Sequence, residues 1–284
     1  MRIQHNIMAM NAYRNFSNNT SALSKNLEKL SSGYKVNRAG DDAAGLAISE
    51  KMRAQITGLE AAHKNTKDAV SLVKTAEGAL QEVQDMLNRM VYLSEQSANG
   101  TYDNHVDRAA LQDEVTSLAT EITRIGTTAN FNGQKLLNGQ LTSVSFQIGD
   151  SADPADRLEM STALGGAVTS LVGFAVSVNV ATASAAISSI AVLRGNGTAA
   201  NPGLINQISS LRGKLGAVQN RLEHTQNNLS VMRENMQDAE ATIRDTDVAE
   251  EMMAYTKNNI LVQSAQAMLA QANAVPQGVL QLLQ

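Results

Sequence analysis

The sequence predicts a mainly α-helical protein, in which a long, coiled-coil-like rod of helices is built from both chain ends. Apolar residues recur at alternating steps of three and four over 69–90, 111–125 and 208–236, as in helices that pack along one another. Because these stretches lie far apart in the chain, we expect its early and late parts to pack together. On their own, such seams indicate no more than an ordinary bundle core. The predicted seam consists of Ala69, Val73, Ala76, Leu80, Val83, Leu87, Leu111, Val115, Leu118, Ile122, Ile208, Leu211, Leu215, Val218, Leu222, Leu229 and Met232.

The composition argues against several classes of function. The 284-residue chain has a net charge of −4 and no cysteine, which argues against a nucleic-acid partner and rules out thiol catalysis and cysteine-bound metals. Charged residues make up 18% of the chain, whereas about 25% is ordinary for a soluble domain. Since long solvated helices are normally rich in charge, this low value predicts that neighbouring subunits cover more than one helix face.

No motif typical of an enzyme is found in the sequence. The four histidines fall in four different predicted elements, and HExxH, GxSxG and P-loop patterns do not occur. Gly195, Gly197 and Ala200 match a GxGxxA pattern, but Pro202 follows at once and no βαβ unit surrounds them. We therefore predict no catalytic residue, no metal site and no cofactor.

Helix ends in the first half of the chain are marked by capping residues. A first amphipathic helix is expected to end near Ser32, with Gly33 as its left-handed stop. Asp41 or Asp42 then caps a very long helix that is predicted to continue to about Asn99-Gly100. Both carboxylates are thus explained by capping rather than by catalysis.

The middle of the chain is predicted to contain a helix, a turn and a β-hairpin. A helix over 107–127 is followed by a turn at 130–133, and alternating apolar residues over 144–148 and 158–164 predict a β-hairpin. The uncharged stretch from Met160 to Leu193 has two interpretations, a membrane span or a surface module rich in Ala, Ser and Thr. Its glycines and hydroxyl side chains lower its hydrophobicity, which favours the module.

The last part of the chain is predicted to be helical up to a proline. The helical pattern continues over 239–271, and Pro276 is expected to interrupt it. Apolar residues then fill 279–283, although chain termini usually fray into water with polar residues. We therefore expect another surface to cover this end.

Several contiguous stretches are similar to a known protein family. Residues 27–52, LEKLSSGYKVNRAGDDAAGLAISEKM, resemble the N-terminal signature of bacterial flagellin. LGAVQNRLEHTQNNL at 215–229 and ILVQSAQAMLAQANAVPQGVLQLL near the end are similar to its C-terminal signatures. Shorter landmarks are SANGT, FNGQKLL and FQIG. The resemblance covers about 1–164 and 204–284.

This resemblance implies a structural subunit that self-assembles head-to-tail into the helical bacterial flagellar filament used for swimming motility. It implies a terminal inner-core domain of two helices (1–40 and 240–284), a rod domain (41–164 and 204–239) with a β-hairpin near 140–164, and a short variable surface module (165–203). The implied filament-core contacts are Ile3, Ile7, Leu23, Leu27, Leu30, Val279, Leu280, Leu282 and Leu283.

Partners and location also follow from the resemblance. It implies type III export without a cleaved signal, an extracellular flagellum, an export chaperone at the C-terminal segment, and filament cap and hook–filament junction proteins. Arg89, Leu93 and Glu114 would contact an innate receptor, Toll-like receptor 5; alternatively, the two charged residues are solvated neighbours. Two other interpretations stay open: a secreted helical translocator or junction protein of a type III secretion or flagellar apparatus, and an enzyme with a site in the middle module.

Overall fold

The computed structural model describes residues 6–138, 143–161, 177–195 and 203–282, and long helices dominate it. The mainly α fold class predicted from the sequence is confirmed. The helices are α1 (Ile7–Ser32), α2 (Ala43–Ala98), α3 (Asp107–Thr128), α5 (Ala183–Arg194), α6 (Leu204–Arg244) and α7 (Val248–Leu282), with a short 3-10 helix η1 (Pro154–Asp156). The strands are β1 (Asn130–Phe131), β2 (Gln134–Lys135), β3 (Ser143–Gln147) and β4 (Arg157–Ser161).

The chain divides into two compact units, and both ends of the chain belong to the same one. The terminal unit contains Met1–Ile56 and Glu234–Gln284, and the rod unit contains Thr57–Arg233. The sequence placed these boundaries at 40/41 and 239/240, whereas the observed divisions lie at 56/57 and 233/234, inside α2 and α6. A division inside a continuous helix is not marked by a turn or a helix cap, so no local pattern could have placed it.

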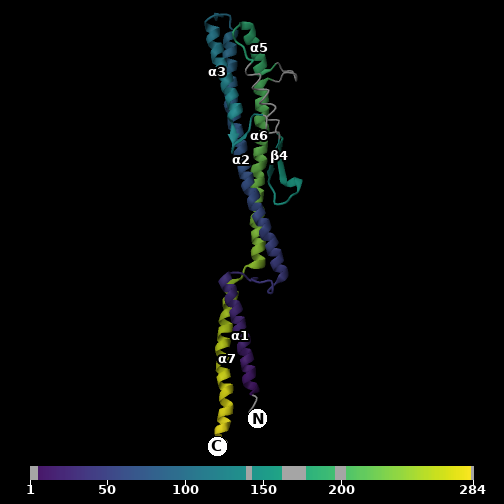
Figure 1. Cartoon of the computed structure of the whole chain (residues 1–284), viewed down its shortest axis with the longest axis vertical. Coiled ribbons are helices and arrows are strands. Elements are labelled where there is room, and N and C mark those ends of the chain that lie inside the picture. Colours follow the sequence, from purple (N-terminus) through teal and green to yellow (C-terminus); the bar gives the residue numbers. More distant parts are fainter. Residues whose placement is uncertain (1–5, 139–142, 162–176, 196–202, 283–284) are drawn as a thin grey trace. The chain divides into compact units, whose positions relative to one another are not determined.

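The core of the rod unit lies between three helices. In this unit α2, α3 and α6 run side by side (Figure 1), and their seams meet in one buried apolar cluster. Val73, Val115 and Leu215 illustrate the three contributions, one from each helix, and all are buried. Among the predicted seam residues, Leu111, Leu118 and Val218 are only half-buried, and Met232 is 47% exposed. The remaining predicted seam residues are buried.

Capping residues set the ends of α1 and α2. Asn6 Oδ1 accepts a hydrogen bond from Ala9 N at 3.1 Å, so Asn6 caps the start of α1. The helix ends at Gly33, which adopts φ 76° and donates its N–H to the Lys29 carbonyl at 2.8 Å. Asp42 Oδ1 accepts from Gly45 N at 2.9 Å, which makes Asp42 the cap of α2.

A β-hairpin packs on the side of the rod unit. Strands β3 and β4 pair antiparallel, with Phe146 opposite Leu158, and the side chain of Leu158 is buried in the rod core. The connection between them approaches α2 closely at Gly58, where an added Cβ would lie 3.0 Å from Asp150 Cβ. The hairpin predicted over 144–148 and 158–164 is thus confirmed for the described residues, while 162–164 lie outside them.

Buried polar contacts close the end of the rod unit where α2 stops. Arg108 Nε donates to the Ser97 carbonyl at 2.9 Å, and its Nη2 donates to the Asn99 carbonyl at 2.8 Å. A cation therefore lies at the negative end of the α2 dipole. Ser97 Oγ donates to the Val180 carbonyl at 2.6 Å and Val180 N donates to Gln112 Oε1 at 2.6 Å, which attaches the segment before α5.

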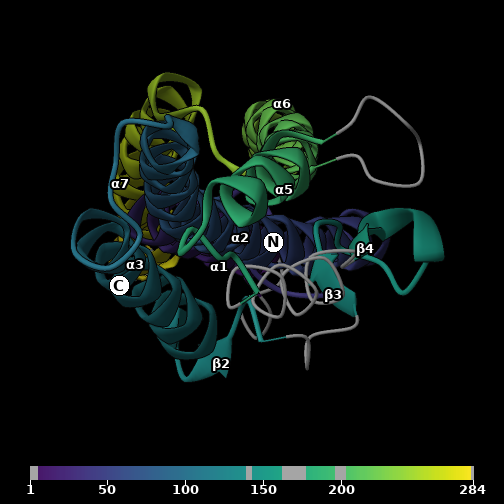
Figure 2. The same ribbon diagram turned by 90° about the horizontal axis from the view of Figure 1, so that it is seen from above.

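The described end of the uncharged stretch, residues 177–193, packs against the helices of the rod unit. Helix α5 lies beside α6 in both views (Figures 1 and 2), and Ala186 and Leu193 on α5 belong to the rod core. Within the described ranges, no helix is both long enough and apolar enough to cross a lipid bilayer. Much of the stretch, 162–176, lies outside the described residues.

Two predictions for the last part of the chain are wrong. The helical pattern over 239–271 is not continuous: α6 ends at Arg244 and α7 starts at Val248. Asp247 makes this break possible, because its Oδ1 accepts from Ala249 N at 2.8 Å and so caps α7. Conversely, the interruption expected at Pro276 does not occur, and α7 continues through it to Leu282.

Candidate functional site: the paired terminal helices

Helices α1 and α7 pack against each other as an antiparallel pair (Figure 1). At one end, Asn6 Nδ2 donates to the Ala272 carbonyl at 2.8 Å. Near the other end, Lys29 Nζ lies 3.6 Å from Glu251 Oε2. Since the start of α1 meets the last third of α7 at Ala272, the first and last described helices form one structural element.

The contact face of this pair is small and partly polar. Within 6–32 and 248–275, only Asn26, Ala265 and Ala272 are buried. The Asn26 amide, oriented with its nitrogen toward Glu251, donates to Glu251 Oε1 at 3.0 Å and accepts from Asn258 Nδ2 at 3.0 Å. Buried asparagines at a helix seam lower stability but specify register. The pair therefore has little apolar burial to hold it together.

Many large apolar side chains of the pair are not covered by its contact face. They are spread along both helices, and each is more than a third exposed. Apolar side chains exposed in such number on one element indicate an interaction site. The exposed residues are Ile7, Met8, Met10, Tyr13 and Leu27 on α1, and Val248, Met252, Met253, Ile260, Leu261, Met268 and Val275 on α7.

The predicted filament-core contacts fall on different parts of this pair. Ile7 and Leu27 are exposed on α1, whereas Leu23 and Leu30 are half-buried. Ile3 and Leu283 lie outside the described residues, as do the side chains of Val279, Leu280 and Leu282 within α7. The methionines of both helices were not among the predicted contacts, although a search for large apolar residues off the helix seam would have found them.

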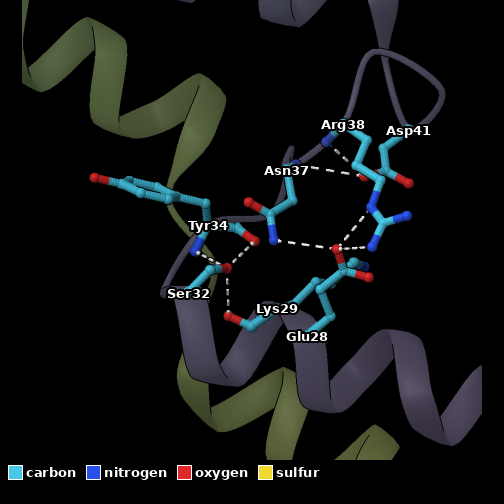
Figure 3. A network of polar contacts seen from close by, with 7 residues as sticks. All are labelled: Glu28, Lys29, Ser32, Tyr34, Asn37, Arg38 and Asp41. Carbon is cyan, nitrogen blue, oxygen red and sulfur yellow. Dashed lines mark hydrogen bonds and ion pairs between the residues drawn. The ribbon is translucent and has the colours of Figure 1, made fainter.

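The segment that follows α1 is held by a polar network (Figure 3). Arg38 Nε donates to Glu28 Oε1 at 2.8 Å, which ties the segment back to α1. Asp41 Oδ2 accepts the Arg38 N–H at 3.1 Å, and this backbone hydrogen bond lowers the pKa of the Asp41 carboxyl. Ser32 Oγ accepts from Tyr34 N at 3.1 Å and closes the turn after the helix. Local contacts thus shape the path of the chain from α1 to α2.

The same segment pairs with the break between α6 and α7. Lys35 N donates to the Arg244 carbonyl at 2.7 Å, and Tyr34 forms an antiparallel bridge with Asp245. The Arg244 guanidinium lies 4.6 Å from the centre of the Tyr34 ring and 2.9 Å from Glu50 Oε1. Its hydrogen bond to Glu50 lowers the pKa of that carboxyl. No local pattern in the sequence indicates this junction, because its members are far apart in the chain.

The predicted receptor contact combines two exposed residues and a buried one. Arg89 Nη2 lies 2.7 Å from Glu114 Oε1, and the Arg89 guanidinium lies 5.3 Å from the centre of the Tyr92 ring. Leu93 is only 1% exposed and belongs to the rod core. An exposed pair of this kind contributes about 0–1 kcal/mol to stability. Among the residues that the structure describes, no cluster of histidine, aspartate and glutamate could hold a metal ion.

Comparison with known proteins places both ends of the chain in one family. The bacterial flagellin N-terminal helical region matches residues 3–142, and the bacterial flagellin C-terminal helical region matches residues 200–283. The chain is 47% identical to a flagellin of Bacillus subtilis (strain 168) and 44% identical to the flagellar filament 33 kDa core protein of Treponema phagedenis. Each alignment covers 100% of both chains.

A solved structure shares the fold. A putative flagellar hook-associated protein from Vibrio parahaemolyticus matches 72% of this chain and 100% of its own with a TM-score of 0.57. At 13% identity, this likeness concerns the fold alone and does not favour a junction protein over a filament protein. With both terminal regions matched and a full-length relative at 47% identity, the chain belongs to the bacterial flagellins.

Proposed function

We propose that this chain is the structural subunit of an extracellular bacterial flagellar filament, and that the paired terminal helices are its contact surface for sister subunits. The observation that carries this proposal is the row of exposed apolar side chains on α1 and α7, from Ile7 to Val275. Left in water, such a surface costs free energy for every methylene group that stays solvated. Copies of the same chain are the partner that the family membership supports.

The contact between copies is head-to-tail. A self-complementary interface closes on itself in a dimer, whereas a heterologous interface that does not close produces an open helical filament. The α1–α7 pair has only three buried side chains among those described, so it depends on neighbours for most of its burial. It therefore becomes fully ordered when sister subunits cover it, and assembly and folding of the chain ends are one process.

The remaining proposed partners contact the chain ends before or during assembly. A type III apparatus exports the chain, and a chaperone binds its C-terminal segment. The cap and hook–filament junction proteins contact the ends in the growing filament. Toll-like receptor 5 would approach the rod at Arg89 and Glu114, which form an exposed ion pair. The buried Leu93 then acts from beneath that surface by positioning α2.

Truncation tests the proposed role of the ends. Deleting residues 279–284 is expected to leave the melting of the rod unit unchanged, because these residues are outside that unit. Polymerisation onto filament seeds is expected to stop. Circular dichroism measures the first outcome, and sedimentation with electron microscopy measures the second.

A matched control shows whether any change in the tail blocks assembly or only the loss of its residues. Gln281→Ser alters the same segment but keeps its leucines and valine, and this variant is expected to polymerise. Normal filaments from the truncated chain would contradict the proposal. So would a full-length chain that remains monomeric with its ends protected from proteases.

A further inference from the structure

Pro276 creates an unusual feature inside α7. The helix continues through this proline to Leu282. In an α-helix each N–H donates to the carbonyl four residues earlier, and proline has no N–H to donate. The carbonyl of Ala272 therefore loses the donor that every other type of residue at 276 would supply. A buried carbonyl without a donor costs about 1–3 kcal/mol.

Asn6 supplies the missing donor from the other end of the chain. Its Nδ2 donates to the Ala272 carbonyl at 2.8 Å, across 266 positions of sequence. The acceptor belongs to a residue that is only 8% exposed, one of the few buried positions on α7. The Oδ1 atom of the same amide accepts from Ala9 N and caps α1. One side chain thus satisfies one backbone group in each of the two helices.

This contact exists in a single register of α1 against α7. Sliding one helix by a turn moves every contact by about 5.4 Å, which takes the Asn6 amide out of reach of the Ala272 carbonyl. The apolar contacts of the pair discriminate poorly between registers, since Ala265 and Ala272 are its only buried apolar residues among the described side chains. Polar contacts such as those of Asn6 and Asn26 must therefore set the register.

We propose that Asn6 and Pro276 form a register lock between the two ends of the chain, in which the proline frees a carbonyl that Asn6 then satisfies. Asn6 is then a positioning residue. It sets which exposed side chains of α1 and α7 lie next to one another on the surface presented to sister subunits. This inference rests on the proposed function, because the register matters when neighbours must pack on both helices at once.

A double-mutant cycle in the full-length chain tests the lock. Asn6→Ser keeps an N-cap oxygen for Ala9 but is too short to reach α7, so it removes the lock and spares the cap. Pro276→Ala restores the backbone N–H and gives the Ala272 carbonyl its own donor within α7. The wild type, both single variants and the double variant are polymerised on seeds, and the critical concentration of each is measured.

The lock predicts non-additive effects. In the wild-type background, Asn6→Ser is expected to raise the critical concentration roughly threefold to tenfold, the effect of one lost hydrogen bond. In the Pro276→Ala background, the same substitution is expected to change it less than about twofold, since the carbonyl no longer needs Asn6. An equal effect in both backgrounds would show that Asn6 acts independently of Pro276 and would overturn the lock, as would no effect in either background. Failure of the wild type to polymerise would instead refute the proposed function.

Discussion

The rod unit and the α1–α7 pair of the terminal unit use similar apolar periodicity with opposite results. In the rod unit the stripes of α2, α3 and α6 meet, and residues such as Leu222 are completely buried. In the α1–α7 pair the apolar side chains are mostly outside the contact face, and Met253 is 68% exposed. Periodicity therefore shows that a helix face will be covered, but it does not show whether the same chain covers it.

The largest expected effect is loss of the rod fold. Leu222→Asp places an unpaired carboxylate in the core between α2 and α6, which is expected to destabilise the rod unit by about 4 kcal/mol or more. Thermal unfolding followed by circular dichroism measures this loss. Cooperative melting at the wild-type temperature would show that burial of Leu222 does not stabilise the rod unit.

The same substitution in the terminal unit is expected to separate assembly from folding. Met253→Asp should leave the melting of the monomer unchanged within about 0.5 kcal/mol, because the side chain is exposed. It should raise the critical concentration for polymerisation more than roughly hundredfold, since sister subunits would have to bury a charge. Ile187→Asp, at an exposed position on α5 in the rod unit, is the matched control and should polymerise normally. A monomer destabilised by Met253→Asp would remove the contrast between the units.

A pair of arginines sharpens the comparison within the rod unit. Arg108 is 5% exposed and donates to two carbonyls at the end of α2, so Arg108→Gln should cost about 2 kcal/mol or more by leaving them unsatisfied. Arg89→Gln breaks an exposed ion pair with Glu114 and should cost about 0–1 kcal/mol. Urea unfolding of the two variants compares them directly. Equal losses would mean that capping α2 contributes no more than a surface ion pair.

The smallest expected effect is a pH dependence of the junction in the terminal unit. The hydrogen bond from Arg244, together with nearby Arg53, lowers the pKa of Glu50 below its ordinary value of 4.5. The contribution of the pair is therefore complete at neutral pH, and it is lost as the pH falls below about 4.5 and through the folded-state pKa. Filaments of the wild type and of Glu50→Gln should differ slightly in dissociation temperature at pH 6, and the difference should shrink as the pH falls below about 4.5. A difference that grows on acidification would contradict the assignment.

Features that depend on neighbouring residues could be predicted from the sequence. Gly33 stops α1 and Asp42 caps α2 because a helix end needs groups only a few residues away. The alternation that forms β3 and β4 and the seams of the rod helices is likewise visible in short windows. The family signatures at both ends pointed to the flagellins for the same reason, since they are contiguous runs of residues.

Features that depend on distant residues were missed or mistaken. The break at 245–247 is stabilised by pairing with Tyr34 and Lys35, and nothing near Asp245 in sequence reveals that partner. Pro276 was expected to interrupt the last helix, because a proline removes one backbone hydrogen bond from a helix. In the structure, Asn6 from the opposite end of the chain donates a hydrogen bond to the carbonyl that the proline leaves without a donor.

The sequence by itself determined where α1 stops, where α2 and α3 start and stop, which helix faces are apolar, and to which family the chain belongs. Only the tertiary structure decided which of those faces the chain covers for itself and which it leaves exposed. The physical reason is that helix periodicity and capping depend on residues within a few turns. Burial depends on which distant segments meet, and here both ends of the chain meet in a pair too thin to bury its own apolar side chains.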